Sequence, residues 1–431
     1  MTNNIINKKQ LDVSLKFGVL ALGMGGCSVG CEIGNIKLGD DYPYKALLIN
    51  SNIQDFRKLD IKNPNTTKKI ELKGFEEGAG RDIKVGEKAF EANKQEILEQ
   101  VHKEFNDRDF VWIVAGLGGG TGSGSVISAI KLLFDNGFKR KLGLILTMPM
   151  DDEGGQVVAN AIYQFQKITK ASKALGSIIV VDNQKIYNDY QKDRAGDSTN
   201  HAEFLKFCNK YVADILHEMN VVTKNYTPLG RDNFDVSEFR RMLAQPGFLT
   251  LVRKEFEKPT DISNNISESV KEISTAIESG VLSDGYDFVT VKRAAIAMIA
   301  NEQNAEKTFT TGLYNALVND VMNDYGKFSS EKPIATYADN AIGGGAKLYA
   351  AFAGLTPPKR IVELVEKYET YEQELAQQNA HKDEVLEKLQ SVSVSLNNSY
   401  SDNDSDLDLD FGDGPNSNKE EEEEELELNF D

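Results

Sequence analysis

Short apolar runs and longer amphipathic stretches alternate through the first 220 residues of the chain. The short runs are rich in Val, Ile, Leu and aromatic residues, as buried β-strands are, whereas the longer stretches repeat apolar residues at helical spacing. This alternation predicts a parallel sheet with helices on both faces and with ligands at the carboxyl ends of the strands. The predicted strands are residues 14–22, 45–50, 68–72, 109–115, 141–148 and 176–182, and the clearest predicted helices are residues 85–105 and 125–134.

A long helical pattern over residues 200–224 is apolar on more than one face, which is typical of a helix buried between two layers. It predicts a central helix that connects a first domain, residues 1–199, to a smaller α/β domain, residues 225–357. A further helix with proline at its start is predicted over residues 358–390. The strand-like runs of the second domain are residues 248–255, 286–300, 332–340 and 347–355.

Residues 391–431 consist mainly of Ser, Asn, Asp and Glu, and predict a disordered acidic tail. This tail holds 14 acidic residues and one basic residue, so it accounts for most of the net charge of −18. The body carries no basic stripe, and we therefore expect contact with DNA only through a partner. A pattern in the tail occurs twice, as LDLDFG (407–412) and LELNFD (426–431). It is either a chance repeat or a docking peptide.

Apolar runs of membrane-spanning length are absent from the sequence, and the N-terminus lacks the apolar core of a signal peptide. We therefore expect a cytoplasmic protein without membrane contact. The three cysteines are an odd number, and the four histidines are scattered along the chain. This pattern favours buried thiols in a reducing compartment and predicts no metal site made by side chains.

Six glycines occupy nine positions in GLGGGTGSG, residues 116–124, between a predicted strand and a predicted helix. Such a loop presents free backbone N–H groups and the positive end of a helix dipole, where phosphate binds. A flexible turn is the alternative interpretation. The candidate phosphate contacts in this loop are Gly118, Gly119, Gly120, Thr121, Gly122, Ser123 and Gly124.

Two further small-residue segments can approach a ligand closely, GMGGCSVG (23–30) and EGAGR (77–81). Two glycine loops on one sheet can grip a polyphosphate from both sides. A P-loop motif is absent, and Ser28 stands where a dinucleotide fold needs its third glycine. A nicotinamide enzyme is therefore disfavoured.

The segment GGGTGSG (118–124) resembles the signature loop of the tubulin and FtsZ superfamily of GTPases. The order of the other elements agrees with that superfamily over residues 15–390, and the TubZ family of plasmid and phage tubulin-like GTPases is the most similar. The resemblance implies GTP and GDP as substrate and product, Mg²⁺ as a cofactor, and residues 225–357 as a GTPase-activating domain.

Other segments resemble the remaining nucleotide loops of the family. GMGGCSVG resembles the first phosphate loop and residues 78–89 the third, while TMPMDDEG (147–154) resembles the ribose-side loop. Asn183 and Asp214 stand where guanine contacts are expected, and both would accept hydrogen bonds from the base. The contacts implied in these segments are Gly23, Met24, Gly25, Gly26, Cys27, Asn52, Gly78, Ala79, Gly80, Thr147, Glu153, Asn183, Tyr211 and Asp214.

Some of these assignments have ordinary structural alternatives. Asn183 suits a turn after a strand, Asp214 suits an exposed helix surface, and Tyr211 suits either base stacking or the core. The sequence also departs from FtsZ, because Asn52 replaces an aspartate and Val157 replaces an arginine. These departures bear on the ribose and metal contacts rather than on the phosphate loops.

NFDVSEF (233–239) resembles the family's catalytic loop, with Asp235 and Glu238 as its acidic pair. In that family the loop meets the γ-phosphate of the next subunit, so hydrolysis would require polymerisation. The same D-x-x-E spacing at a helix start is also a capping box. Both interpretations apply to these two residues.

The resemblance implies a head-to-tail filament that segregates plasmid or phage DNA through a DNA-binding adaptor. We expect the adaptor to bind the acidic tail or the C-terminal helix. An FtsZ-like role in cell division is one alternative, although the tail lacks FtsZ's basic, proline-containing peptide. A nucleotide-binding metabolic enzyme that does not polymerise is the other.

Overall fold

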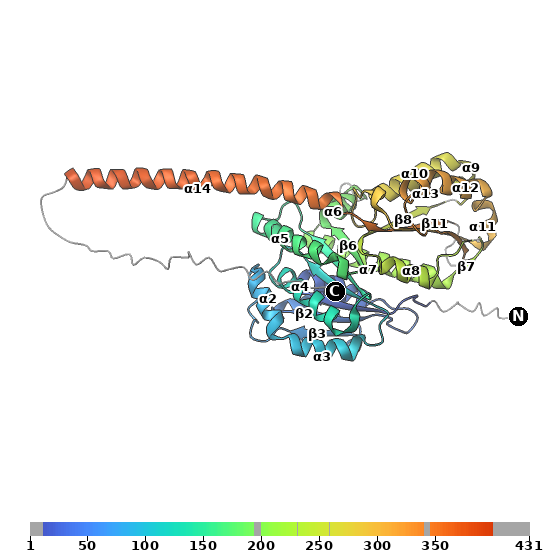
Figure 1. Cartoon of the computed structure of the whole chain (residues 1–431), viewed down its shortest axis with the longest axis horizontal. Helices are drawn as coiled ribbons and strands as arrows, with labels where there is room; N and C mark the ends of the chain where they lie inside the picture. The colour runs from blue at the N-terminus through green and yellow to red at the C-terminus, as the bar shows by residue number, and fades with distance from the viewer. Residues whose placement is uncertain (1–11, 194–199, 231, 258, 340–344, 400–431) are drawn as a thin grey trace. The chain divides into compact units, whose positions relative to one another are not determined.

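The computed structural model describes residues 12–193, 200–230, 232–257, 259–339 and 345–399 (Figure 1). The chain divides into two compact units, Met1–Val365 and Glu366–Asp431. The sheet, the helices that cover it and the candidate site all belong to the first unit.

One sheet of eleven strands runs through the described part of the first unit, in the order β3-β2-β1-β4-β5-β6-β8-β11-β9-β10-β7. Its first six strands are all parallel to one another, as the alternating pattern predicts. They are β1 (Phe17–Leu22), β2 (Lys45–Asn50), β3 (Thr67–Glu71), β4 (Phe110–Gly116), β5 (Leu142–Met148) and β6 (Ser177–Asp182).

The second half of the sheet is mixed. β11 is antiparallel to both β8 and β9, whereas β10 is parallel to β9. β6 pairs with β8 at two positions, and this pairing joins the two halves into a single sheet. The predicted α/β fold is confirmed. The strands of this half are β7 (Thr227–Pro228), β8 (Gly247–Phe256), β9 (Arg293–Ala300), β10 (Ile334–Ala338) and β11 (Ala346–Leu355).

Helices cover both faces of the sheet. Figure 1 shows α10, α12 and α13 above the part formed by β8 and β11, with α7 and α8 below it. The helices of the first half are α1 (Gly23–Gly34), α2 (Ile83–Ala92), α3 (Lys94–Phe105), α4 (Thr121–Leu133), α5 (Gly155–Ala171), α6 (Asn183–Asp193), α7 (His201–Asn225) and α8 (Val236–Leu243). Those of the second half are α9 (Pro259–Asn264), α10 (Ile266–Ser279), α11 (Glu302–Thr308), α12 (Thr311–Ala316) and α13 (Met322–Tyr325).

The structure corrects two of the predicted elements. Residues 85–105 are two helices rather than one, because the Asn93 side chain donates to the carbonyl of Ala89 and its backbone leaves the helical region. Residues 286–300 are not one strand, because the Asp287 side chain accepts the N–H of Val289 and starts a turn of 3₁₀-helix. β9 therefore begins only at Arg293.

The core is continuous across α7. A single apolar cluster contains Phe17 of β1, Leu216 of α7 and Ile299 of β9. Polar bonds add to this packing, since the buried Asn220 side chain accepts the N–H of Leu15 and donates to its carbonyl. The domain boundaries at residues 199 and 224 stay a prediction, because the structure joins both halves in one compact unit.

His217 on α7 makes the stability of the fold depend on pH. Its Nδ1 lies 2.9 Å from the hydroxyl of Tyr44, and burial lowers the pKa of the imidazole to about 4. The unfolded chain binds this proton near pH 6.5 and the folded chain does not, so stability is lost as pH falls through this interval. Relative to His217→Gln, we expect the wild type to lose about 2 kcal/mol more between pH 7 and pH 4.5. Urea unfolding at both pH values measures the difference, and equal losses in the two proteins would contradict it.

α14 (Lys359–Ser399) begins directly after the Pro357–Pro358 pair and buries Leu364. The helix extends past residue 390, where the tail was predicted to begin, and residues 391–399 contain neither glycine nor proline, the residues that most disfavour a helix interior. The remaining predicted tail, including both copies of the repeated pattern, lies outside the described residues. Within the described parts of the chain, no helix has the length and apolar character needed to cross a membrane.

Candidate functional site

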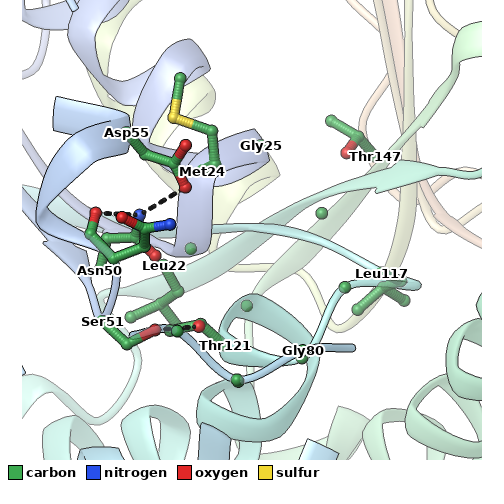
Figure 2. A pocket seen from close by; sticks show the side chains of 18 of the residues that line it. Leu22, Met24, Gly25, Asn50, Ser51, Asp55, Gly80, Leu117, Thr121 and Thr147 are labelled. Atoms are coloured by element: carbon green, nitrogen blue, oxygen red, sulfur yellow. Dashed lines mark hydrogen bonds between the residues drawn. The ribbon is translucent and has the colours of Figure 1, made fainter. Parts of the chain in front are cut away.

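A cavity of about 490 Å³ opens at the carboxyl ends of the parallel strands (Figure 2). Strand ends, loops and helix starts from six separate segments meet there, as expected for a sheet of this topology. The cavity is lined by Leu22, Gly23, Met24, Gly25, Asn50, Ser51, Asn52, Asp55, Glu77, Gly78, Ala79, Gly80, Gly116, Leu117, Gly119, Gly120, Thr121, Gly122, Thr147, Met148, Pro149, Glu153 and Asn183.

Two helices, α1 and α4, begin at this cavity without a side-chain cap. The residues at their N-caps, Leu22 and Gly120, make no capping hydrogen bond, and neither helix has an acidic residue in its first turn. Some other helices are capped, since Asp82 accepts N–H groups at the start of α2 and Asn200 does so for α7, whereas α3, α5 and α10 also begin without a side-chain cap. The uncapped N–H groups and aligned dipoles make the cavity a site for an anionic group such as phosphate.

The glycines of residues 116–124 serve two different purposes. A Cβ atom on Gly119 would meet no atom within 4 Å, so this residue faces open space in the cavity. A Cβ atom on Gly124 would instead lie 2.2 Å from the carbonyl oxygen of Ile83, because α2 and α4 pack backbone to backbone. Some glycines of this segment are therefore explained by the close packing of two helices of the same chain, and not by the approach of a ligand.

The first phosphate segment is not a loop. α1 begins at Gly23, directly after β1, so residues 23–26 form the first helical turn. Gly23 has a positive φ of 67°, and a Cβ atom there would lie 2.6 Å from the backbone nitrogen of Gly122. The starts of α1 and α4 therefore touch each other, and residues of both helix starts line the same cavity.

Most of the predicted ligand contacts lie together. The predicted residues that line the cavity are Gly23, Met24, Gly25, Asn52, Gly78, Ala79, Gly80, Gly119, Gly120, Thr121, Gly122, Thr147, Glu153 and Asn183. Those outside its lining are Gly26, Cys27, Gly118, Ser123, Gly124, Tyr211 and Asp214. Their proposed ligand contacts stay predictions.

Several residues outside the lining support the loops that form it. The Cys27 thiol lies 3.3 Å from the carbonyl oxygen of Ile49, and burial raises its pKa. Ser123 Oγ accepts the N–H of Gly118 at 2.8 Å, which holds the turn before α4. All three cysteines are free and buried, as the sequence predicts.

Of the three residues proposed to contact the base, the cavity lining contains Asn183 and not Tyr211 or Asp214. Asn183 lines the cavity, and its Oδ1 lies 3.5 Å from the thiol of Cys208 on α7. Tyr211 stacks on Phe207 with ring centroids 5.5 Å apart, and Asp214 pairs with Lys210 at 2.7 Å. Asn183 is therefore the base contact that the cavity itself supports.

Two carboxylates in the cavity lining, Asp55 and Glu77, were not among the predicted contacts. Asp55 Oδ2 accepts from the amide of Asn50 at 3.3 Å (Figure 2). Asp55 does not stand at the end of β2 but in the 3₁₀-helix that follows it, η1 (Ile53–Lys58). A search for carboxylates in the residues that follow β2, and not only at its last residue, would have identified Asp55.

Ser51 and Thr121 connect the loop after β2 to the start of α4. Their hydroxyl oxygens lie 2.7 Å apart and are buried, as Figure 2 shows. Among the described residues, no group of three or more His, Cys, Asp or Glu side chains is placed to hold a metal ion. Any metal at this site would therefore depend on ligand oxygens in addition to protein oxygens.

Asp235 and Glu238 form a complete capping box at the start of α8. Asp235 Oδ1 accepts the N–H of Glu238 at 2.9 Å, and Glu238 Oε2 accepts the N–H of Asp235 at 3.0 Å. Burial raises the pKa of Glu238. These hydrogen bonds confirm the capping role. The pair does not line the cavity of its own chain, and its catalytic role stays a prediction.

Comparison with known proteins agrees with this architecture. Residues 17–191 match the model of the tubulin/FtsZ family GTPase domain, and residues 232–359 match that of the C-terminal domain of the tubulin-like protein TubZ. The tubulin-like protein TubZ of Bacillus cereus is 36% identical over 392 residues, which cover 89% of both chains.

Two solved structures share the fold. A GTPγS-form protofilament of TubZ from Bacillus thuringiensis serovar israelensis has a TM-score of 0.73 at 20% identity, covering 87% of this chain and 96% of that one. A type III plasmid segregation TubZ has a TM-score of 0.68 at 18% identity, covering 86% and 96%. The chain therefore belongs to the TubZ family of tubulin-like proteins and is a GTPase.

Proposed function

We propose that this protein is a GTP-dependent filament protein that segregates plasmid or phage DNA and hydrolyses GTP between adjacent subunits. The observation that carries the proposal is the pair of uncapped helix starts, α1 and α4, that meet at one cavity. They are suited to the phosphates of a nucleotide. The likeness to a TubZ protofilament supports the assembly.

In the proposed complex the phosphates contact the N-terminal turns of α1 and α4, and the base lies toward Asn183. Mg²⁺ prefers oxygen ligands and commonly bridges one or two carboxylates and substrate phosphates. Asp55 and the hydroxyls of Ser51 and Thr121 supply such oxygens beside the phosphate end, so the residues fit the ion. Bound Mg²⁺ would neutralise charge on the phosphates.

Asp235 and Glu238 would complete the site of the next subunit. Their absence from the cavity lining of their own chain supports a role at a contact between subunits. The capping box presents both carboxylates on a rigid helix start, which suits a group that must position water. A head-to-tail contact of this kind does not close on itself and generates a filament.

The DNA would be bound through an adaptor protein rather than directly, because the chain has a net negative charge and most of that charge lies in residues 391–431. We propose α14 and the following acidic residues as the adaptor's binding region. The match of residues 232–359 to a TubZ domain favours this role over cell division.

GTP turnover is expected to depend on protein concentration. Below a threshold concentration turnover per subunit should be near zero, and above it turnover and light scattering should rise together, because only assembled subunits have complete sites. The test measures phosphate release and scattering over a dilution series. Turnover per subunit that is constant at all concentrations, without scattering, would favour the metabolic-enzyme alternative.

A further inference from the structure

Arg360 stands in the first turn of α14, yet only 4% of its side chain is exposed. Nη1 donates to Oδ1 of Asp151 at 2.8 Å, and Nη2 donates to the carbonyl of Pro149 at 2.6 Å. Nε lies 3.5 Å from Oδ1 of Asp182. The planar guanidinium holds several oxygens in a fixed geometry, which lysine does not do. One side chain therefore connects α14 to the loop after β5 and to the junction between β6 and α6.

Both of these segments contribute residues to the lining of the cavity. Pro149 lines it directly, and so does Asn183, which follows Asp182 in the chain. The Asp151 N–H also donates to Oε1 of Gln184 at 2.9 Å, which ties the two segments to each other. Arg360 thus supports, from behind, the ribose-side wall and the base-side wall.

The contact between Arg360 and Asp182 is an ion pair without a hydrogen bond. The Asp182 carboxylate is buried and already accepts the N–H groups of Gln184 and Lys185 at the start of α6. Nε of Arg360 is buried without a hydrogen bond, although it lies close to this carboxylate. A shift of the junction between β6 and α6 at Asn183 would therefore change the distance between Asp182 and Arg360.

We propose that Arg360 is a positioning residue for the nucleotide. Through Arg360, nucleotide binding in the cavity stabilises the packing of the first turn of α14, and this packing in turn strengthens nucleotide binding. The inference rests on the nucleotide site proposed above. Coupling of this kind is reciprocal. Bound nucleotide stabilises the packed position of the first turn of α14 by a certain factor, and displacement of that turn weakens nucleotide binding by the same factor. Binding energy at the cavity is thereby connected to the C-terminal helix.

The first test measures the affinity for GDP of full-length subunits kept below the assembly threshold. Arg360→Gln is expected to weaken GDP binding about tenfold, and Arg360→Lys less. Asp151→Asn, which changes an exposed partner of Arg360 and carries little risk to folding, should weaken it a few-fold.

Arg108→Gln is the matched control. Arg108 is also buried, donates to a carboxylate, Asp107, and bonds the carbonyl of Pro43, but it lies before β4, at the end of the strand opposite the cavity. We expect this variant to lose thermal stability and to retain its GDP affinity within twofold. If Arg360→Gln and Asp151→Asn bind GDP as tightly as this control, the inference is wrong.

Hydrogen exchange provides a readout that a purely structural role would not change. In the wild type, GDP should slow amide exchange at residues 360–365, and in Arg360→Gln it should slow exchange only around the cavity. Exchange at residues 360–365 that does not respond to GDP in the wild type would overturn the coupling. Failure of the nucleotide site itself would be recognised separately, because a charge placed at Gly119 would then leave GDP binding intact.

Discussion

Gly119→Asp is expected to abolish nucleotide binding while leaving the fold at least as stable as that of Gly119→Asn. Gly119 lines the cavity just before α4, and a Cβ atom there meets no atom within 4 Å. Its φ is not in the left-handed region, so a side chain adds no backbone strain. The new carboxylate would interact favourably with the free N–H groups of α4 and would occupy the place of a phosphate.

The asparagine variant has the same shape without the charge. Repulsion between a carboxylate and a phosphate about 4 Å away is on the order of several kcal/mol in a partly desolvated site, which corresponds to at least a hundredfold. We therefore expect GDP affinity at least a hundredfold weaker in Gly119→Asp than in Gly119→Asn, with an unchanged or higher melting temperature in the aspartate variant. Titration with GDP and thermal unfolding measure both quantities. Equal affinities in the two variants would place the phosphates elsewhere.

The double variant Asp235→Asn, Glu238→Gln is expected to assemble with GTP but to hydrolyse it about 10²–10⁴ times more slowly. Asparagine caps helices as well as aspartate does, and glutamine can replace glutamate in a capping box, so α8 should keep its start. Only the two negative charges are removed. Phosphate release per assembled subunit and filament lifetime after GTP addition are the quantities to measure.

Asp287→Asn is the matched control, because Asp287 also caps a helical turn, with its side chain accepting the N–H of Val289. This variant should hydrolyse GTP at the wild-type rate. Mixing the double variant with Gly119→Asp provides a direct test of a shared site. The first protein binds nucleotide without the carboxylates, and the second keeps Asp235 and Glu238 without binding nucleotide. Turnover above that of either protein alone is expected, whereas no gain on mixing would contradict hydrolysis between subunits.

The strands of the first half were predictable because burial and β-branched composition are local properties. The predicted run 45–50 is β2 as it stands, and the other parallel strands differ by one to three residues at an end. The errors in the predicted elements occur where a polar side chain forms a hydrogen bond with a nearby backbone group. Asn93 divides a helix, and Asp287 replaces the start of a strand by a 3₁₀ turn, through hydrogen bonds that hydrophobic periodicity does not reveal.

The candidate site was partly predictable, and the missing part has a definite cause. Glycine-rich segments after strands identified Gly23, Gly80 and Gly119 as cavity residues, since the topology of a parallel sheet brings strand ends together. Asp55 and Glu77 were missed although neighbouring residues of both segments were predicted, because small residues and the family motifs, rather than carboxylates, identified these segments.

The sequence by itself determined the alternation of strands and helices, the glycine-rich segments between them and the concentration of acidic charge after residue 390. Each of these follows from residue type and spacing within one segment. Only the tertiary structure decided that Gly124 faces α2 while Gly119 faces the cavity, and that Arg360 supports walls about 200 residues away in sequence. The physical reason is that burial and close contact between distant segments depend on how whole elements pack, which periodicity along one segment does not specify.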